Sequence, residues 1–240
     1  MKYRTLNALV LILATVFLLA GCGGGGGGTT AKSNVKVINA IPDLGSTLET
    51  QINGLIAGTS SAYLADGAFF PIEPADVDLA IKETGTVEDF DILANVFNSN
   101  ASYIVAGMGI KNFGTEFEKR PRIGLFEVNR AEPNGSKARV FVLNALVGPA
   151  EFPSPDIDFQ DGDLPRFPFN DIEFSKAKVL TLDTGTYTYE ARANDSELVY
   201  ASSALTFQSG KVYFVVVGGV VNGTGTSAPT IRVFELPVVD

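Results

Sequence analysis

The sequence contains no histidine and no tryptophan, and Cys22 is its only cysteine. Without histidine the chain lacks the commonest general base and the imidazole ligands of zinc sites, and it cannot form a Ser-His-Asp or Cys-His catalytic group. A single cysteine also excludes an internal disulfide. Enzymatic chemistry would have to depend on carboxylates, Lys, Tyr or Ser alone, and we expect the protein not to be an enzyme.

The first 21 residues have the layout of an export signal. Lys2 and Arg4 precede an almost wholly apolar run, residues 6–20, which ends at Gly21 and Cys22. The run is shorter than the roughly 20 apolar residues that a membrane-spanning helix needs. We therefore expect residues 1–21 to be a cleaved signal peptide, with an uncleaved anchor or an ordinary secretory signal as the alternatives.

The residues at the end of this run, Leu19-Ala20-Gly21-Cys22, resemble a bacterial lipobox. The resemblance implies cleavage before Cys22, diacylglycerol on its thiol and a fatty acyl chain such as palmitate on the new amino terminus; stable anchoring needs more than one chain. Gly23 stands where Asp retains such proteins in the inner membrane of enterobacterial envelopes, so the chain resembles an outer-membrane lipoprotein. Residues 22–33 are rich in Gly and predict a flexible tether.

Acidic residues outnumber basic ones. The chain holds 27 Asp and Glu against 18 Lys and Arg, and removal of residues 1–21 takes away Lys2 and Arg4 and no acid, which leaves a net charge of −11. Such a surface repels nucleic acid and anionic lipid. We expect no nucleic-acid partner, and expect the membrane to be reached through the lipid on Cys22.

The rest of the chain repeats itself at a spacing of 105–110 residues. Matches occur in the same order along both halves, which indicates a tandem duplication of residues 34–130 and 137–240, joined by a polar linker. The matched pairs are Val37-Ile38-Asn39-Ala40 with Val142-Leu143-Asn144-Ala145, Asn53-Gly54 with Asp161-Gly162, residues 76–81 with 186–191, residues 103–105 with 213–215, and residues 121–128 with 229–236.

Both copies have the hydrophobic patterns of strands. Residues 76–82 and 186–192 alternate with a period of two, and residues 103–106 and 212–217 are continuous apolar runs. Asn53-Gly54 and Asp161-Gly162 are the dipeptides that type I′ hairpin turns prefer. We expect an all-β protein of two tandem antiparallel β-sandwiches, immunoglobulin-like or transthyretin-like, each of about seven strands.

The opening of the first copy resembles a known bacterial family. Residues 35–43, Val-Lys-Val-Ile-Asn-Ala-Ile-Pro-Asp, followed by Asn53-Gly54, are similar to the start of domain-of-unknown-function family number 4397. The second copy keeps Asn144-Ala145 but places Pro155-Asp156 about ten residues later, so its first loop is enlarged. The resemblance implies an extracytoplasmic sandwich module, often lipid-anchored, and carries no active site.

Residues 149–174 concentrate five prolines, five phenylalanines and seven acids. One interpretation is a protruding loop whose aromatic side chains bind a protein or glycan; the other is that the same rings pack onto the second sandwich. The candidate partner-binding residues are Phe152, Phe159, Phe167 and Phe169.

Calcium is a further possibility for the same segment, because hard cations bind closely spaced carboxylates. The candidate ligands are Asp156, Asp158, Asp161 and Asp163. Gln160 and Asp161 stand where an EF-hand loop needs an oxygen ligand and a glycine, so the spacing does not favour this site.

Three functions remain open. The favoured one is a non-enzymatic envelope lipoprotein, a binding, structural or adhesive module without a cofactor, whose partner is an envelope protein or glycan. The alternative is a carbohydrate-binding or calcium-assisted module that uses residues 149–174. The last is a carboxylate-dependent hydrolase built on Asp76 and Asp78, which share one face of a predicted strand about 7 Å apart.

Overall fold

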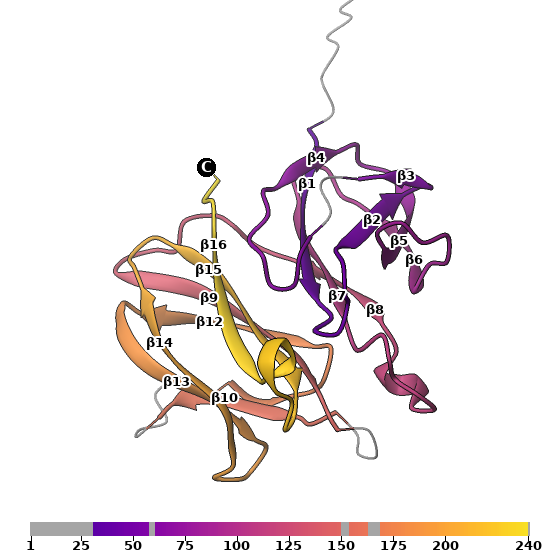
Figure 1. The fold of residues 1–240 in the computed structure, drawn as a ribbon. Coiled ribbons are helices and arrows are strands. Elements are labelled where there is room, and N and C mark those ends of the chain that lie inside the picture. The colour runs from indigo at the N-terminus through magenta and orange to yellow at the C-terminus, as the bar shows by residue number, and fades with distance from the viewer. Residues whose placement is uncertain (1–30, 58–60, 150–153, 163–168, 240) are drawn as a thin grey trace, which may run out of the picture.

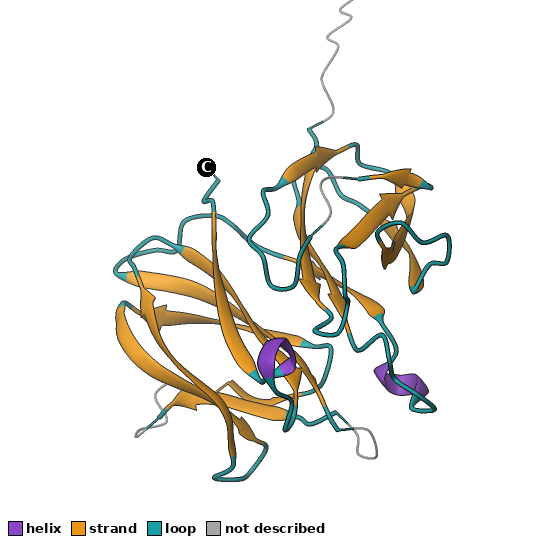
Figure 2. Cartoon of the chain, in the orientation of Figure 1, coloured by secondary structure: helices purple, strands orange, loops and turns teal. Residues whose placement is uncertain are grey.

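The structure, a computed structural model, describes residues 31–57, 61–149, 154–162 and 169–239. The expected signal peptide, Cys22 and the start of the tether lie outside these residues. Strands dominate the described chain, and its only helices are two single 3₁₀ turns (Figure 2). No helix among the described residues is long and apolar enough to cross a membrane.

The strands form two sandwich-like domains, as expected from the sequence (Figure 1). The first contains β1 (Ser33–Ala40), β2 (Leu48–Ile52), β3 (Leu55–Ile56), β4 (Phe70–Ile72), β5 (Asp76–Glu83), β6 (Asp91–Val96), β7 (Ser102–Met108) and β8 (Arg122–Glu127), with η1 (Phe117–Lys119) before β8. The second contains β9 (Lys137–Val147), β10 (Ile157–Asp161), β11 (Phe169–Ile172), β12 (Ala177–Asp183), β13 (Gly185–Ala193), β14 (Val199–Phe207), β15 (Val212–Val220) and β16 (Thr230–Leu236), with η2 (Gly225–Ser227) before β16.

The two domains share one strand order. The first has sheets β4-β1-β7-β8 and β3-β2-β5-β6, and the second has β12-β9-β15-β16 and β11-β10-β13-β14. In each, the first and seventh strands pair in parallel. A constant-type immunoglobulin domain instead places its first strand in a sheet with its second, fourth and fifth. The strand order therefore favours the transthyretin-like alternative, with eight strands in each domain.

The strand register agrees with the repeat at residue level. Val35 lies opposite Tyr103 in the first domain, and Val140 lies opposite Tyr213 in the second. These pairs reproduce the sequence shifts of 105 and 110. The hydroxyl of Tyr103 accepts a hydrogen bond from the backbone N–H of Asn98 at 3.2 Å, and that of Tyr213 accepts one from Gln208 at 3.0 Å. This contact resembles the tyrosine corner of other sandwiches, and it fixes the entry to the seventh strand in both copies.

One predicted turn is confirmed and the other is wrong. Asn53 and Gly54 have φ of 51° and 76° and join β2 to β3, as a type I′ turn requires. Asp161 instead ends β10 without a positive φ, and the chain reaches β11 only at Phe169. Gly162 N–H donates to Thr188 O as Asn53 N–H donates to Asp78 O, so Gly162 is the counterpart of Asn53. The insertion that follows overrides the turn preference of the Asp-Gly dipeptide.

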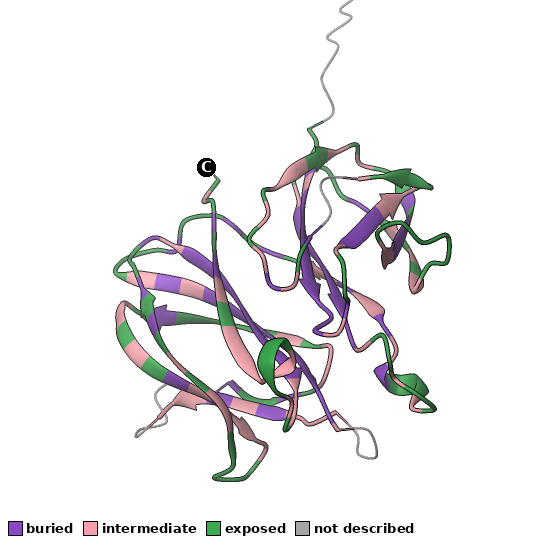
Figure 3. Ribbon diagram, viewed as in Figure 1, coloured by how far each residue is buried: buried purple, intermediate pink, exposed green. Residues whose placement is uncertain are grey.

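Each sandwich has its own core, and a third apolar cluster joins the two. Figure 3 marks the buried residues on the strands of both domains. The first core lies between β1, β2, β5 and β7, and the second between β9, β10, β13 and β15. The shared cluster contains Ile38, Ala40, Leu64, Ile104, Ala106, Met108 and Val128 from the first domain and Phe141, Leu143, Ala145, Val212, Phe214, Val216, Phe234 and Leu236 from the second.

The shared cluster explains why β7 and β15 are apolar without alternation. One face of each strand points into its own core, and the other face lies against the neighbouring domain, so β7 is buried at every position. Two cations are enclosed beside this cluster. Lys36 Nζ contacts Asp66 Oδ1, and the Arg130 guanidinium lies 4.1 Å from the centre of the Phe69 ring and donates to Pro237 O at 3.1 Å. The two repeats therefore pack together through the equivalent sheet of each.

Candidate functional site

Two of the three described phenylalanines of the 149–174 segment, Phe159 and Phe169, are core residues, whereas Phe174 is half-buried beside the Arg122 guanidinium, which lies 5.3 Å from its ring centre. Phe159 is 0% exposed and Phe169 is 1% exposed. The Phe159 ring stacks on Tyr189 with centroids 4.7 Å apart and meets the Phe169 ring at 5.9 Å. The proposal that Phe159 and Phe169 bind a partner is therefore wrong, because no partner can reach rings that fill the second sandwich. Phe152 and Phe167 lie outside the described residues.

Among the described acids of the same segment, Asp158 is hydrogen-bonded to the backbone. Asp158 accepts hydrogen bonds from the N–H of Asp171 at 2.8 Å and of Asp195 at 3.2 Å, and both of these residues have φ of 52°. Its carboxylate thereby holds the irregular part of β11 at Asp171 and the turn at Asp195. Among the described residues no group of three or more acidic or cysteine side chains is placed to hold a metal ion. Asp163 lies outside the described residues, whereas Asp156 directly precedes β10 and Asp161 is its last residue.

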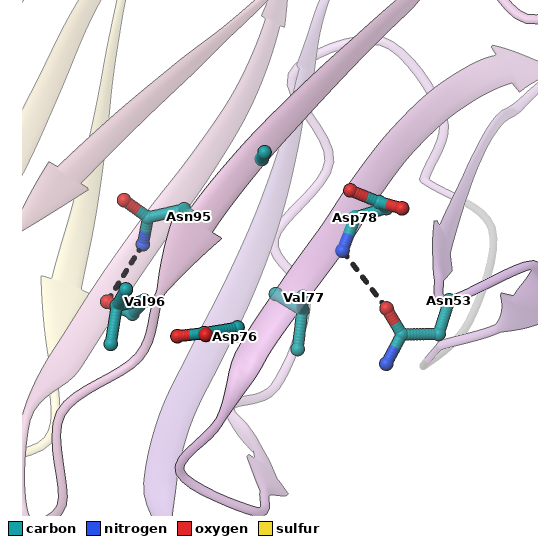
Figure 4. Close-up of a pocket in the computed structure, with 7 residues that line it drawn as sticks. Asn53, Asp76, Val77, Asp78, Asn95 and Val96 are labelled. Carbon is teal, nitrogen blue, oxygen red and sulfur yellow. Dashed lines mark hydrogen bonds between the residues drawn. The ribbon is translucent and has the colours of Figure 1, made fainter.

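A hollow lies on the outer face of the first domain, over β5 and β6 (Figure 4). Its volume is about 450 Å³, and it is widely open to solvent. Seven residues line it, namely Asn53, Asp76, Val77, Asp78, Ala94, Asn95 and Val96. The site therefore combines carboxylates, amides and aliphatic side chains in one shallow depression.

The chain folds locally so that both acids point outward. In β5 the inward positions Val77, Leu79 and Ile81 are buried, which places Asp76 and Asp78 on the exposed face. The Asp78 N–H donates to Asn53 Oδ1 at 2.9 Å, so the β2–β3 turn is fastened to one wall of the hollow (Figure 4). The pair Asp76 and Asp78 thus lies where the sequence predicted it.

The opposite wall of the hollow carries no acid. It is formed by Ala94, Asn95 and Val96 of β6, and the Asn95 amide donates to Val96 O at 2.9 Å. A carboxylate-dependent glycosidase needs two acids that flank the substrate from different sides. Asp76 and Asp78 stand on one strand, so the arrangement suits the binding of a positive group better than the cleavage of a glycosidic bond.

Next to the hollow, the same sheet face holds an ion pair that is already satisfied. Lys82 Nζ lies 3.2 Å from Glu49 Oε1, and Gln51 Nε2 donates to the same oxygen at 2.8 Å. The hydrogen bond from Gln51, together with Lys82, lowers the pKa of Glu49. Lys82 is thereby engaged with Glu49, and Asp76 and Asp78 form no ion pair among the described residues.

Sequence reasoning missed the apolar part of this site. Ile92 is 60% exposed and Val96 is 56% exposed, and Ala94 between them is also exposed. Their spacing of two residues in Asp91-Ile92-Leu93-Ala94-Asn95-Val96 is the signal that could have revealed a strand with an aliphatic outer face.

Comparison with known proteins identifies no family. No family model matches the chain, and no curated protein sequence matches it. Among solved structures, a leucine-rich repeat protein from Bacteroides thetaiotaomicron is similar over 80% of this chain and 26% of its own length, with 10% sequence identity and a TM-score of 0.18. The chain therefore spans about a quarter of that structure.

Proposed function

We propose that the protein is a non-enzymatic lipoprotein of the bacterial envelope, anchored through lipid on Cys22, that presents a double β-sandwich to a partner. The lipobox-like residues before Cys22 and the glycine-rich tether support the anchor. The resemblance to domain-of-unknown-function family number 4397 supports an extracytoplasmic module. The outer membrane is the proposed location, since Gly23 follows the cysteine.

The observation that carries the proposal is the shared apolar cluster between the repeats. Phe126 of the first domain and Phe214 of the second have ring centroids 6.0 Å apart within it. Burial of side chains such as Phe214 contributes about 1.5–3 kcal/mol each, so the two domains resist separation. A rigid body on a glycine-rich tether suits presentation of a surface at a distance from the membrane.

The open hollow over β5 and β6 supports binding rather than catalysis. Its acids share one wall, and the chain has no histidine to act as a general base. The net charge of −11 after cleavage disfavours nucleic acid and anionic surfaces as partners. An envelope protein or a glycan remains the proposed class of partner, with no cofactor required.

Replacement of the anchor residue tests the proposal. Full-length wild type, Cys22→Ser and the tether control Gly26→Ala are expressed in a bacterial host that processes lipoproteins, and membrane and soluble fractions are compared. We expect wild type and Gly26→Ala in the membrane fraction, with a lipid-modified Cys22 peptide by mass spectrometry. Membrane retention of Cys22→Ser equal to wild type would falsify the lipid anchor.

A further inference from the structure

The outer face of sheet β3-β2-β5-β6 differs from its counterpart in the second domain, although the strand register is the same. In both domains the facing strands are related by a shift of 110 residues, so positions can be compared one by one. The cross-strand pairs are Asp76–Val96, Asp78–Ala94 and Ala80–Ile92 in the first domain, and Thr186–Thr206, Thr188–Ala204 and Glu190–Ser202 in the second.

In the second domain, polar side chains of this face form hydrogen bonds with one another. The hydroxyls of Thr186 and Thr206 lie 2.9 Å apart in a hydrogen bond across the strands. Glu190 accepts a hydrogen bond from Arg192 Nε at 2.7 Å, so its charge is neutralised on its own strand. Hydroxyl pairs of this kind stabilise a solvated sheet surface. The second domain therefore offers little reason for a partner to bind here.

In the first domain the polar side chains at the positions equivalent to Thr186 and Thr188 have no such partners within the described chain. Among the described residues, the carboxylates of Asp76 and Asp78 make no hydrogen bond or ion pair, and Ile92 and Val96 are 60% and 56% exposed beside them. Single exposed aliphatic residues are common on protein surfaces, but here three aliphatic positions of β6 form a continuous stripe along two free acids. The duplication thus kept the fold and changed the chemistry of one face.

We propose that this face, Asp76 and Asp78 with Ile92, Ala94 and Val96, docks an extended segment of a protein partner that carries both basic and aliphatic side chains. The inference rests on the proposed binding function and names the chemistry of its partner. Residues two apart on a strand lie about 7 Å apart, and neighbouring strands about 4.8 Å apart. Lys or Arg of the segment would contact the acids of β5 while Val or Ile covers the stripe on β6.

Charge decides between a foreign partner and a second copy of the chain. A second copy that used the same face would bring its own Asp76 and Asp78 towards these acids, and like charges that face each other are destabilising. The chain as a whole is also acidic. A basic segment instead gains attraction from both carboxylates, most strongly at low salt.

A synthetic peptide of alternating Lys and Val, seven residues long, serves as the probe against the full chain in neutral detergent micelles. Binding is followed by calorimetry and by ¹H–¹⁵N NMR of the labelled protein, and a Glu-Val peptide of the same length is the probe control. We expect the Lys-Val peptide to shift amide signals of β5 and β6, and its affinity to fall with added salt.

Variants that exchange the two faces give the decisive comparison. Asp76→Thr with Asp78→Thr, and separately Ile92→Ser with Val96→Thr, install the residues that the second domain tolerates at the same positions. The charge-matched control is Glu88→Gln with Asp89→Asn, two exposed acids in the β5–β6 loop. We expect each face variant to weaken peptide binding about five- to tenfold, from about 1 kcal/mol of lost contacts, and the control to bind like wild type.

The reverse exchange tests sufficiency. Thr186→Asp, Thr188→Asp, Ser202→Ile and Thr206→Val together should add a second set of shifted amide signals, on β13 and β14. The docking proposal is overturned if the loop control loses as much affinity as the face variants, if shifts fall elsewhere, or if the peptide does not bind at low salt. None of these outcomes alters the membrane fractionation of Cys22→Ser, so the two proposals fail separately.

Discussion

Asn39 and Asn144 occupy equivalent positions in the two domains and make the same backbone contact. Both side chains are 0% exposed, and each Oδ1 accepts a hydrogen bond at 3.0 Å from the N–H two residues later, Ile41 or Leu146. The Asn39 amide also donates to Ser61 O at 3.0 Å. The Asn-Ala pair shared by the two repeats thus places a buried, hydrogen-bonded amide at the end of β1 and near the end of β9.

Asn144 makes more of these contacts than Asn39. Its Nδ2 donates to Pro155 O and to Ile172 O, both at 2.8 Å. We expect Asn144→Ala to lower the free energy of unfolding by about 3 kcal/mol, because buried carbonyls left without a donor cost about 1–3 kcal/mol each. Urea unfolding measures this loss, with the exposed Asn170→Ala as control. A loss below that of Asn39→Ala would contradict the assignment.

The interface between the domains makes a prediction about cooperativity. Phe214 projects from β15 towards the first domain, whereas its neighbour Val215 projects into the core of the second. We expect Phe214→Ala to cost about 3–5 kcal/mol and to split one calorimetric transition into two, since it opens the contact that couples the domains. Val215→Ala is the matched control and should lower stability without the split. A single transition at an unchanged temperature in Phe214→Ala would contradict the coupling.

Much of the fold could be predicted from sequence because the duplication presents the hydrophobic pattern of each strand twice. The apolar runs at residues 103–106 and 212–217 were correctly predicted to be strands, and they lie in β7 and β15. What covers their second face was not predictable, since apolar residues at Ile104 or Phe214 are equally suited to a core and to a domain interface. The prediction of a hairpin turn at Asp161-Gly162 was wrong because an insertion after β10 replaces the short connection that the dipeptide favours.

The candidate site was harder to predict, for a physical reason. Phe159 follows Ile157 by two residues, and this spacing on one strand face was the available sign that Phe159 is a core residue. Asp76 and Asp78 were placed correctly by the alternation of β5. The stripe on β6 depends on which of its two faces turns outward, and only the pairing with β5 fixes that choice.

A buried glycine in each domain makes a sharp stability prediction. Gly219 has a φ of 106°, and a Cβ at this position would lie 2.4 Å from Ala228 O; at Gly109, with φ of 109°, it would lie 2.5 Å from Arg120 O. We expect Gly219→Ala and Gly109→Ala each to cost at least about 2 kcal/mol, from left-handed strain and the clash together. Gly45→Ala, with open space around it, is the control in the same urea titrations. Equal stability of all three variants would contradict this backbone geometry.

Tyr63 makes a prediction about alkaline stability. Its side chain lies between the domains, where a Cβ at Gly218 would be 3.2 Å from the hydroxyl, and that hydroxyl has no hydrogen-bond partner among the described residues. Burial raises the pKa of Tyr63 to about 12. An unfolded tyrosine has a pKa of about 10, so between these values the unfolded chain releases the proton that the folded chain keeps. The contribution of Tyr63 to stability is therefore lost as pH rises from about 10 to 12.

Tyr63→Phe removes this pH dependence and the unpartnered hydroxyl together. We expect the variant to be at least as stable as wild type at pH 8, where the tyrosine is protonated in both states, and to gain on wild type progressively from pH 10 to 11. Urea midpoints of both proteins across this range give the difference, and other ionisable groups cancel in it. A constant difference between pH 8 and 11 would show that the Tyr63 hydroxyl ionises as easily in the folded protein as in the unfolded chain.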